Sequence, residues 1–180
     1  MKSAFYIKIE NSTAHRKSRD SICELALNNS QNLEKLFDFA LDLENKNHFK
    51  ACWSLELVLE QNILLIIPYL TLFCDTLSRY KHDSAIRSIS KICLFISKSK
   101  QIELSDKQEQ QIIETCMDWL IQDEKVATKA YAMRALHNFS KSNLWIRDEL
   151  KVILTQYYSF HSAAYKAAAK DILNKNRHLK

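Results

Sequence analysis

The side chains best suited to binding a charged partner are six lysines and arginines in apolar, helix-forming segments. Lys and Arg neutralise phosphate or carboxylate groups, and the formal net charge of +5 points to an anionic partner. Nucleic-acid binding would require one continuous basic surface. At about 100° per residue, their helix positions span a wide arc, so we expect a scattered basic face, with nucleic-acid binding as the alternative. The six residues are Arg87, Lys91, Lys129, Arg134, Lys166 and Lys170.

Catalytic and metal chemistry has little support in the residue pattern. No two histidines share the one-turn spacing with which a helix grips a metal ion. A chain without glycine cannot form the glycine-rich loops that hold nucleotide phosphates. No Ser or Cys lies in a recognisable nucleophile motif, although a triad assembled only in space stays open. The sequence predicts no catalytic residue, metal site or cofactor and favours a non-enzymatic protein.

The five cysteines are predicted to be small core residues. Their number is odd, they form no C-x-x-C pair, and each lies among apolar residues. This pattern disfavours a disulfide framework or a zinc site and predicts a reducing, cytoplasmic environment. The cysteines are Cys23, Cys52, Cys74, Cys93 and Cys116.

Two apolar segments bear on export and membrane insertion. Residues 1–10 lack the uninterrupted apolar region of a signal peptide. The run from Ile63 to Cys74 is broken by Pro68 and is shorter than the roughly 18–20 apolar residues of a membrane span. We expect this run to form a buried helix, and we expect no membrane association.

The elements that carry these residues are predicted to be helices throughout. The composition, 47% hydrophobic and 26% charged, is that of an ordered soluble protein with one core. Glycine is absent and proline occurs once, so the chain lacks the residue that tight hairpin turns prefer. Ser105 and Gln108 form a capping-box sequence at one helix start, and Asp123 is predicted to cap a later helix.

A repeated pattern groups these helices into pairs. A small residue recurs about every 40 residues, and an aliphatic residue follows it four positions later on the same helix face. The position before the small residue is also assigned to the core, so Tyr131 is expected to be a core aromatic. The small landmark residues are Ser54, Ser90, Ala132 and Ala168, followed by Val58, Leu94, Leu136 and Ile172.

The period predicts three regions along the chain. Residues 1–31 form an N-terminal segment whose capping helix covers Ser21 to Asn28. Residues 32–176 form one domain of about four helix pairs, and residues 177–180 form a frayed tail. A closed antiparallel bundle would show amphipathic helices at similar spacing and stays the alternative.

Two segments resemble HEAT repeats. The stretch from Ile66 to Ser90 contains a proline in its first helix, a polar turn, and a second helix with an aliphatic-Arg pair at Ile86-Arg87. The alanine-rich segment Lys129 to Leu136 is similar to the second helix of the same family. The resemblance covers about residues 32–176 and implies an all-α fold, an α-α superhelix of about four HEAT-like helix pairs. Pro68 is the only such proline and His137 replaces a usual small residue, so armadillo-like superhelices stay open.

The resemblance implies two kinds of function. HEAT-like scaffolds bind protein partners through their helical surfaces, so we expect a protein partner or self-association. HEAT-like folds also include DNA glycosylases that use an Asp with tryptophans and basic residues. Asp118-Trp119 and Trp145 with Asp148 offer these residue types, but both tryptophans fit core positions and Asp148 suits a helix first turn. We expect a scaffold, with a nucleic-acid-binding or DNA-repair module as the alternative.

A second apolar face lies five positions after the landmark residues. Helices packed on both sides would explain it. The alternative is an open groove for a partner helix or a second copy of the chain. The positions are Leu59, Phe95, His137 and Leu173.

Overall fold

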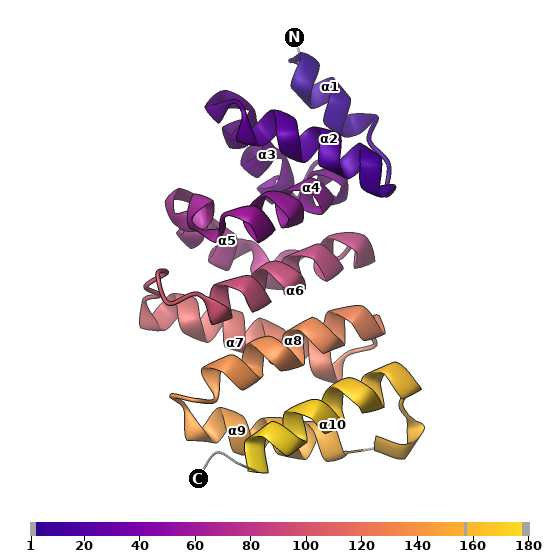
Figure 1. Ribbon diagram of the computed structural model, residues 1–180, viewed down its shortest axis with the longest axis vertical. Coiled ribbons are helices and arrows are strands. Elements are labelled where there is room, and N and C mark those ends of the chain that lie inside the picture. The colour runs from indigo at the N-terminus through magenta and orange to yellow at the C-terminus, as the bar shows by residue number, and fades with distance from the viewer. Residues whose placement is uncertain (1–2, 157, 178–180) are drawn as a thin grey trace. The chain divides into compact units, whose positions relative to one another are not determined.

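The computed structural model describes residues 3–156 and 158–177, and helices dominate them (Figure 1). No β-strand occurs in this described part of the chain, and the predicted all-α class is confirmed. The chain forms two compact units, Met1–Ile92 and Cys93–Lys180. The boundary falls inside the helix α6, Asp83–Lys98.

The first unit surrounds an apolar core with short helices. Helices α2, α3 and α4 contact one another, and α1 packs against α3 and α4. Leu36, Phe37 and Leu55 are fully buried there. The helices that precede α6 are α1 Ala4–Glu10, α2 Arg16–Leu27, α3 Ser30–Leu41, α4 His48–Gln61 and α5 Leu70–Thr76, and the 3₁₀ turns η1 Ile63–Tyr69 and η2 Leu77–Arg79 flank α5.

The N-terminal segment contains two helices where the sequence predicted one. Helix α2 begins at Arg16, earlier than the predicted start at Ser21, and an ion pair of 2.8 Å between Arg16 and Asp20 spans its first turn. Ile22 is buried on the face that α2 turns toward α3 and α4. Helix α1 precedes α2, and both helices contribute buried residues to the core of the first unit.

The apolar run around Pro68 differs from the single buried helix that was predicted. Residues Ile63–Tyr69 form a 3₁₀ helix and α5 follows, because Pro68 has no N–H and its ring disturbs a continuous α-helix. Ile66 is buried, whereas Ile67 and Leu72 are 50% and 55% exposed. The prediction of a buried helix is therefore wrong for the outward side of this run.

The second unit consists of paired helices that follow the end of α6. Helices α7 and α8 lie side by side, and α8 also contacts α9 and α10 (Figure 1). The predicted capping box at Ser105 and Gln108 is confirmed. The predicted cap at Asp123 is wrong, because α8 starts only after Lys125, beyond its reach. The elements are α7 Asp106–Ile121, α8 Val126–Phe139, α9 Leu144–Thr155, η3 Tyr158–Phe160 and α10 Ala163–Arg177.

The landmark residues confirm the predicted helix register. All four small residues and the four aliphatic residues that follow them are buried. The residue immediately before each landmark is not always buried, because it lies about 100° around the helix from the landmark. Ile89 is buried, but Tyr131 is only half-buried, so its assignment as a core aromatic is wrong.

The remaining predicted core positions also have defined places. All five cysteines are buried, as predicted. On the second apolar face, Leu59 and His137 are buried, and Phe95 and Leu173 are half-buried. Neighbouring helices therefore cover most of this face, which supports packing on both sides. Apart from Arg177 at the end of α10, the tail predicted to fray lies outside the described residues.

Candidate binding surface

Arg87 and Lys91 extend from α6 to a buried carboxylate on α4. Arg87 Nη1 lies 2.9 Å from Glu56 Oε2, and Lys91 Nζ lies 2.9 Å from Glu56 Oε1. The Glu56 side chain is only 2% exposed. Lys91 also pairs with Glu60 at 3.1 Å. A buried carboxylate requires such partners, because an unpaired charge away from water is strongly unfavourable.

The protonation of Lys91 reflects this environment. Burial by itself lowers the pKa of the ammonium group, but hydrogen bonds and attraction from Glu56 and Glu60 outweigh that effect. The net result is a pKa above the ordinary value for lysine. Lys91 therefore remains charged as part of an internal ion network that joins α4 to α6.

The other four predicted binding residues lie on α8 and α10, and none of them pairs with an acidic side chain of the described residues. Lys129 Nζ donates to the carbonyl of Leu120 at 3.1 Å, and Arg134 Nη1 to that of Ala130 at 3.4 Å. Lys166 Nζ donates to the carbonyl of Ser159 at 2.8 Å. Lys170 is exposed. Carbonyl contacts orient these cations without neutralising them.

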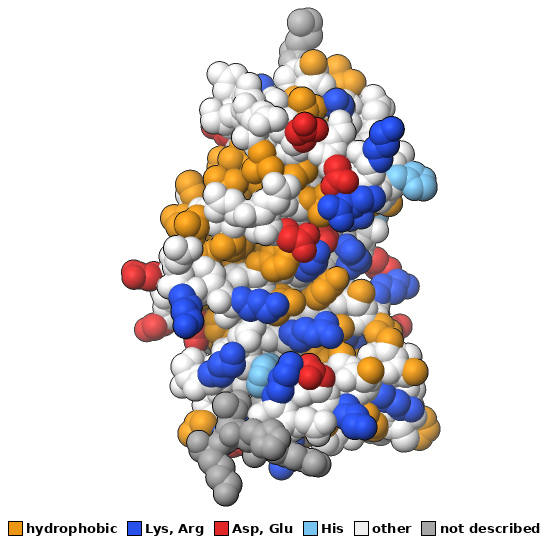
Figure 2. Space-filling view, viewed as in Figure 1, with side chains coloured by type: hydrophobic (Ala, Val, Ile, Leu, Met, Phe, Trp, Pro, Cys, Tyr) orange, Lys and Arg blue, Asp and Glu red, His pale blue; other side chains and the backbone are white. Residues whose placement is uncertain are grey.

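The sequence of α8 and α10 explains this excess of positive charge. Helix α8 contains no Asp or Glu, and the one acidic residue of α10, Asp171, pairs with Lys175 at 2.8 Å. Figure 2 shows Lys and Arg side chains over the area where α8 and α10 lie, with few acidic side chains among them. The neighbouring α7 contains Asp106, Glu109, Glu114 and Asp118. Charge is thus segregated between the helices of the second unit.

The cations of α8 and α10 affect the pKa of the His161 imidazole. Burial lowers the pKa of its imidazole, and the nearby charges of Lys129 and Lys166 lower it further. The ring also stacks on Tyr165, with the ring centroids 3.8 Å apart. Helices α8 and α10 contact each other, so Lys129 and Lys166 both lie near His161 in one positive region.

The residues considered for DNA-glycosylase chemistry do not form a common site. Trp119 is buried in the core, as predicted, but Trp145 is 58% exposed, so its assignment to the core is wrong. Trp145 lies in the first turn of α9, where the helix turns Ile146 inward instead. The Asp148 side chain is 78% exposed and lies 3.9 Å from Arg147. An exposed carboxylate of this kind lacks the enclosed setting of a catalytic acid or base.

The described residues contain no group of three His, Cys, Asp or Glu side chains that could hold a metal ion. Their helices are all too short or too polar to cross a membrane.

The helix pairing and the buried small landmarks define an all-α helical-repeat protein. The sequence matches the family described as HEAT repeat domain over residues 9–176, and the chain belongs to that family. The match begins within α1 and includes α2, which the predicted repeat domain at 32–176 left out. Comparison with curated proteins and with solved structures gave no match.

Proposed function

We propose that this protein is a non-enzymatic scaffold that binds an acidic protein partner on the surface of α8 and α10. The observation that carries the proposal is the set of cations on these helices that have no acidic partner among the described residues, namely Lys129, Arg134, Lys166 and Lys170. Cations that are not neutralised internally attract an acidic surface and accelerate its association. Rigid helix pairs hold them in fixed positions, which favours a specific partner.

The cytoplasm is the compartment that we propose. Five buried thiols without a disulfide are compatible with a reducing environment, where cysteines serve as small apolar residues. An acidic partner in that compartment would bind the surface of α8 and α10. Its carboxylates would not have to displace a carboxylate of the described residues from the four cations.

Photo-crosslinking tests the proposed surface. A photoreactive residue at Lys170 should capture a discrete partner, and one at Lys151 on α9 should not. The triple variant Lys129→Glu, Lys166→Glu, Lys170→Glu should weaken association with the captured partner by at least about tenfold, since each lost charged contact contributes about 1 kcal/mol or more. The matched control Lys98→Glu, Lys100→Glu, Lys151→Glu changes the net charge equally at exposed positions. Equal loss in both variants, or no adduct at Lys170, would contradict the proposal.

Nucleic-acid binding is the second candidate because of one aromatic residue. Phe160 is 86% exposed, and the adjacent Ser159 carbonyl accepts from Lys166. An exposed aromatic ring beside a lysine is the combination that binds stacked bases of a single strand. Fluorescence anisotropy with a single-stranded oligonucleotide at low salt tests it. Salt-sensitive binding that is lost in Phe160→Ala would favour this candidate over an acidic protein.

A further inference from the structure

A groove on the second unit lies where α7 and α9 begin. It has a volume of about 370 Å³, and acidic and apolar side chains line it together. The acids are Asp106, Glu109 and Glu114 of α7. Trp145 of α9 also lines the groove and is 58% exposed, and Ile113 of α7 adds a buried aliphatic side chain. The groove therefore offers apolar area next to negative charge.

The carboxylates of this groove are held by neutral groups. Glu109 accepts from Asn143 Nδ2 at 2.8 Å, and Glu114 accepts from Gln110 Nε2 at 2.7 Å. Neither of these carboxylates, nor that of Asp106, forms an ion pair within the described part of the chain. An amide orients a carboxylate but does not neutralise it, so the charge remains available to a cation.

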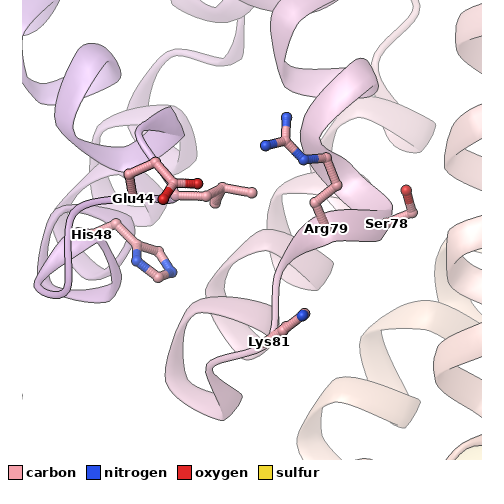
Figure 3. A pocket seen from close by; sticks show the side chains of 6 residues that line it. Glu44, His48, Ser78, Arg79 and Lys81 are labelled. Atoms are coloured by element: carbon pink, nitrogen blue, oxygen red, sulfur yellow. The ribbon is translucent and has the colours of Figure 1, made fainter.

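A cavity of the first unit has a different charge pattern. Figure 3 shows Glu44 and His48 on one side of it and Arg79 and Lys81 on the other. Acidic and basic side chains of the same unit thus share that cavity. The groove of the second unit has no basic side chain among the described residues that line it, so its field attracts a cationic surface.

The second unit also carries an exposed group with the complementary properties, an aromatic knob formed by Phe160 and Lys166. Phe160 ends η3 and is 86% exposed. The Ser159 carbonyl accepts from Lys166 Nζ at 2.8 Å, and Tyr158 donates its hydroxyl to the Lys166 carbonyl at 3.1 Å. These bonds fix η3 to the start of α10 and keep a cation near the ring. Aromatic side chains with a large apolar area are enriched at protein interfaces.

The groove and the aromatic knob lie at opposite ends of α9. The helix begins at the groove and ends before η3, and its 12 residues span about 18 Å. In Figure 1, α7 and α9 begin on the left, whereas α10 begins on the right. The two complementary surfaces therefore do not meet within one chain. A contact between two copies would bring them together.

We propose that the aromatic knob of one copy of this protein docks in the groove of a second copy. Phe160 would pack on Trp145, and Lys166 would face the carboxylates of α7. A second copy is the occupant because both halves of the contact lie on one unit, with opposite charges that steer them together. This inference rests on the function proposed above, since it names the acidic partner of α10. A contact between two different surfaces leaves one of each open, so it repeats in a ring or a row of copies.

Sedimentation velocity of the full chain measures this association. The wild-type chain should form complexes that grow with concentration from about 10 µM to about 1 mM, and salt should weaken them because the charges are exposed. The groove variant, Trp145→Ala with Glu114→Lys, should weaken the association at least about tenfold. Glu149→Lys with Val152→Ala is the matched control, because it makes the same change in charge and also removes an exposed apolar side chain from α9. Circular dichroism checks that each variant is folded.

A mixture of two variants tests whether the contact joins two different surfaces. The knob variant, Phe160→Ala with Lys166→Glu, keeps the groove, and the groove variant keeps the knob. Neither should associate alone, but the two together should form a one-to-one complex that does not grow further. The inference is overturned if the wild-type chain stays monomeric, if the groove variant associates as the control does, or if the mixture forms no complex.

The outcome for this contact can be separated from that for the proposed function. A wild-type chain that stays monomeric while a photoreactive residue at Lys170 captures a different acidic protein overturns the self-contact and supports the proposed function. A monomeric chain that also gives no adduct at Lys170 contradicts both. Capture of a second copy at Lys170, lost in the groove variant, supports both.

Discussion

The cations on α6 and those on α8 and α10 have the same residue types and similar positions in the repeat, but opposite surroundings. In the first unit, Arg87 and Lys91 pair with Glu56, whose side chain is 2% exposed. In the second unit, Lys129 and Lys166 contact only carbonyl oxygens among the described residues. For the cations of α10 the difference follows from the preceding second helix, since α4 contains Glu56 whereas α8 contains no acid. A basic residue of a helical repeat can therefore stabilise the fold or remain available for binding.

Removal of Glu56 tests the structural side of this comparison and should have the largest effect. Glu56→Ala leaves Arg87 and Lys91 without their shared carboxylate and opens space in α4, so we expect the free energy of unfolding to fall by about 3 kcal/mol. Urea denaturation followed by circular dichroism measures it. Glu60→Ala is the control, because Glu60 is 45% exposed and should cost less than about 1 kcal/mol. Equal losses in the two variants would show that the buried ion pairs of Glu56 do not stabilise the first unit more than an exposed acid does.

Charge reversal at matched arginines compares the two surfaces directly. Arg87→Glu places a second carboxylate against buried Glu56, so we expect a loss of about 2 kcal/mol in the free energy of unfolding. Arg134→Glu removes only a contact to the Ala130 carbonyl and should cost about 0.5 kcal/mol. Both variants change the net charge equally, so thermal and urea unfolding report the local environment. A larger loss in Arg134→Glu would reverse the comparison.

Alkaline pH should destabilise the first unit through a buried thiol. Burial raises the pKa of Cys52 to about 12, from an ordinary 9.0. The folded protein thus holds a proton that the unfolded chain loses above pH 9, and the stability present below pH 9 falls as pH rises toward 12. The expected slope from this group is about 1.4 kcal/mol per pH unit. Cys52→Ala should reduce the slope, and urea unfolding at a series of pH values measures it. A slope unchanged in that variant would contradict the assignment.

The sequence predicted those features that depend on local pattern. The missing glycine and the period of small residues were enough for the helices and their register, and Ser54, Ser90, Ala132 and Ala168 are all buried. The capping box at Ser105 also depends only on neighbouring residues, and it formed as expected. Tyr131 and Trp145 were misplaced because a helix position next to the core face can turn either way, depending on the neighbouring helix.

The candidate sites required contacts between residues distant in sequence. Glu56 had the type and spacing of a surface residue, and only the packing of α6 on α4 shows that it neutralises Arg87. Its place within an apolar stretch, Leu55 to Leu59, was the available signal, because a charge there must find a partner. Such sites are defined by tertiary structure.

Acid should affect the second unit through His161, with the smallest effect of these predictions. Burial, and then the charges of Lys129 and Lys166, lower the pKa of the folded imidazole. The unfolded chain therefore binds a proton at a higher pH than the folded protein. The stability from this group is present above the unfolded value, near 6.5, and is lost as pH falls through the lower folded value. NMR titration of the His161 ring checks the direction of the shift. In Lys129→Gln with Lys166→Gln the pKa should rise toward the ordinary value, whereas Lys98→Gln with Lys151→Gln should leave it unchanged. If the first pair leaves the pKa unmoved, the positive region shared by α8 and α10 does not exist in solution.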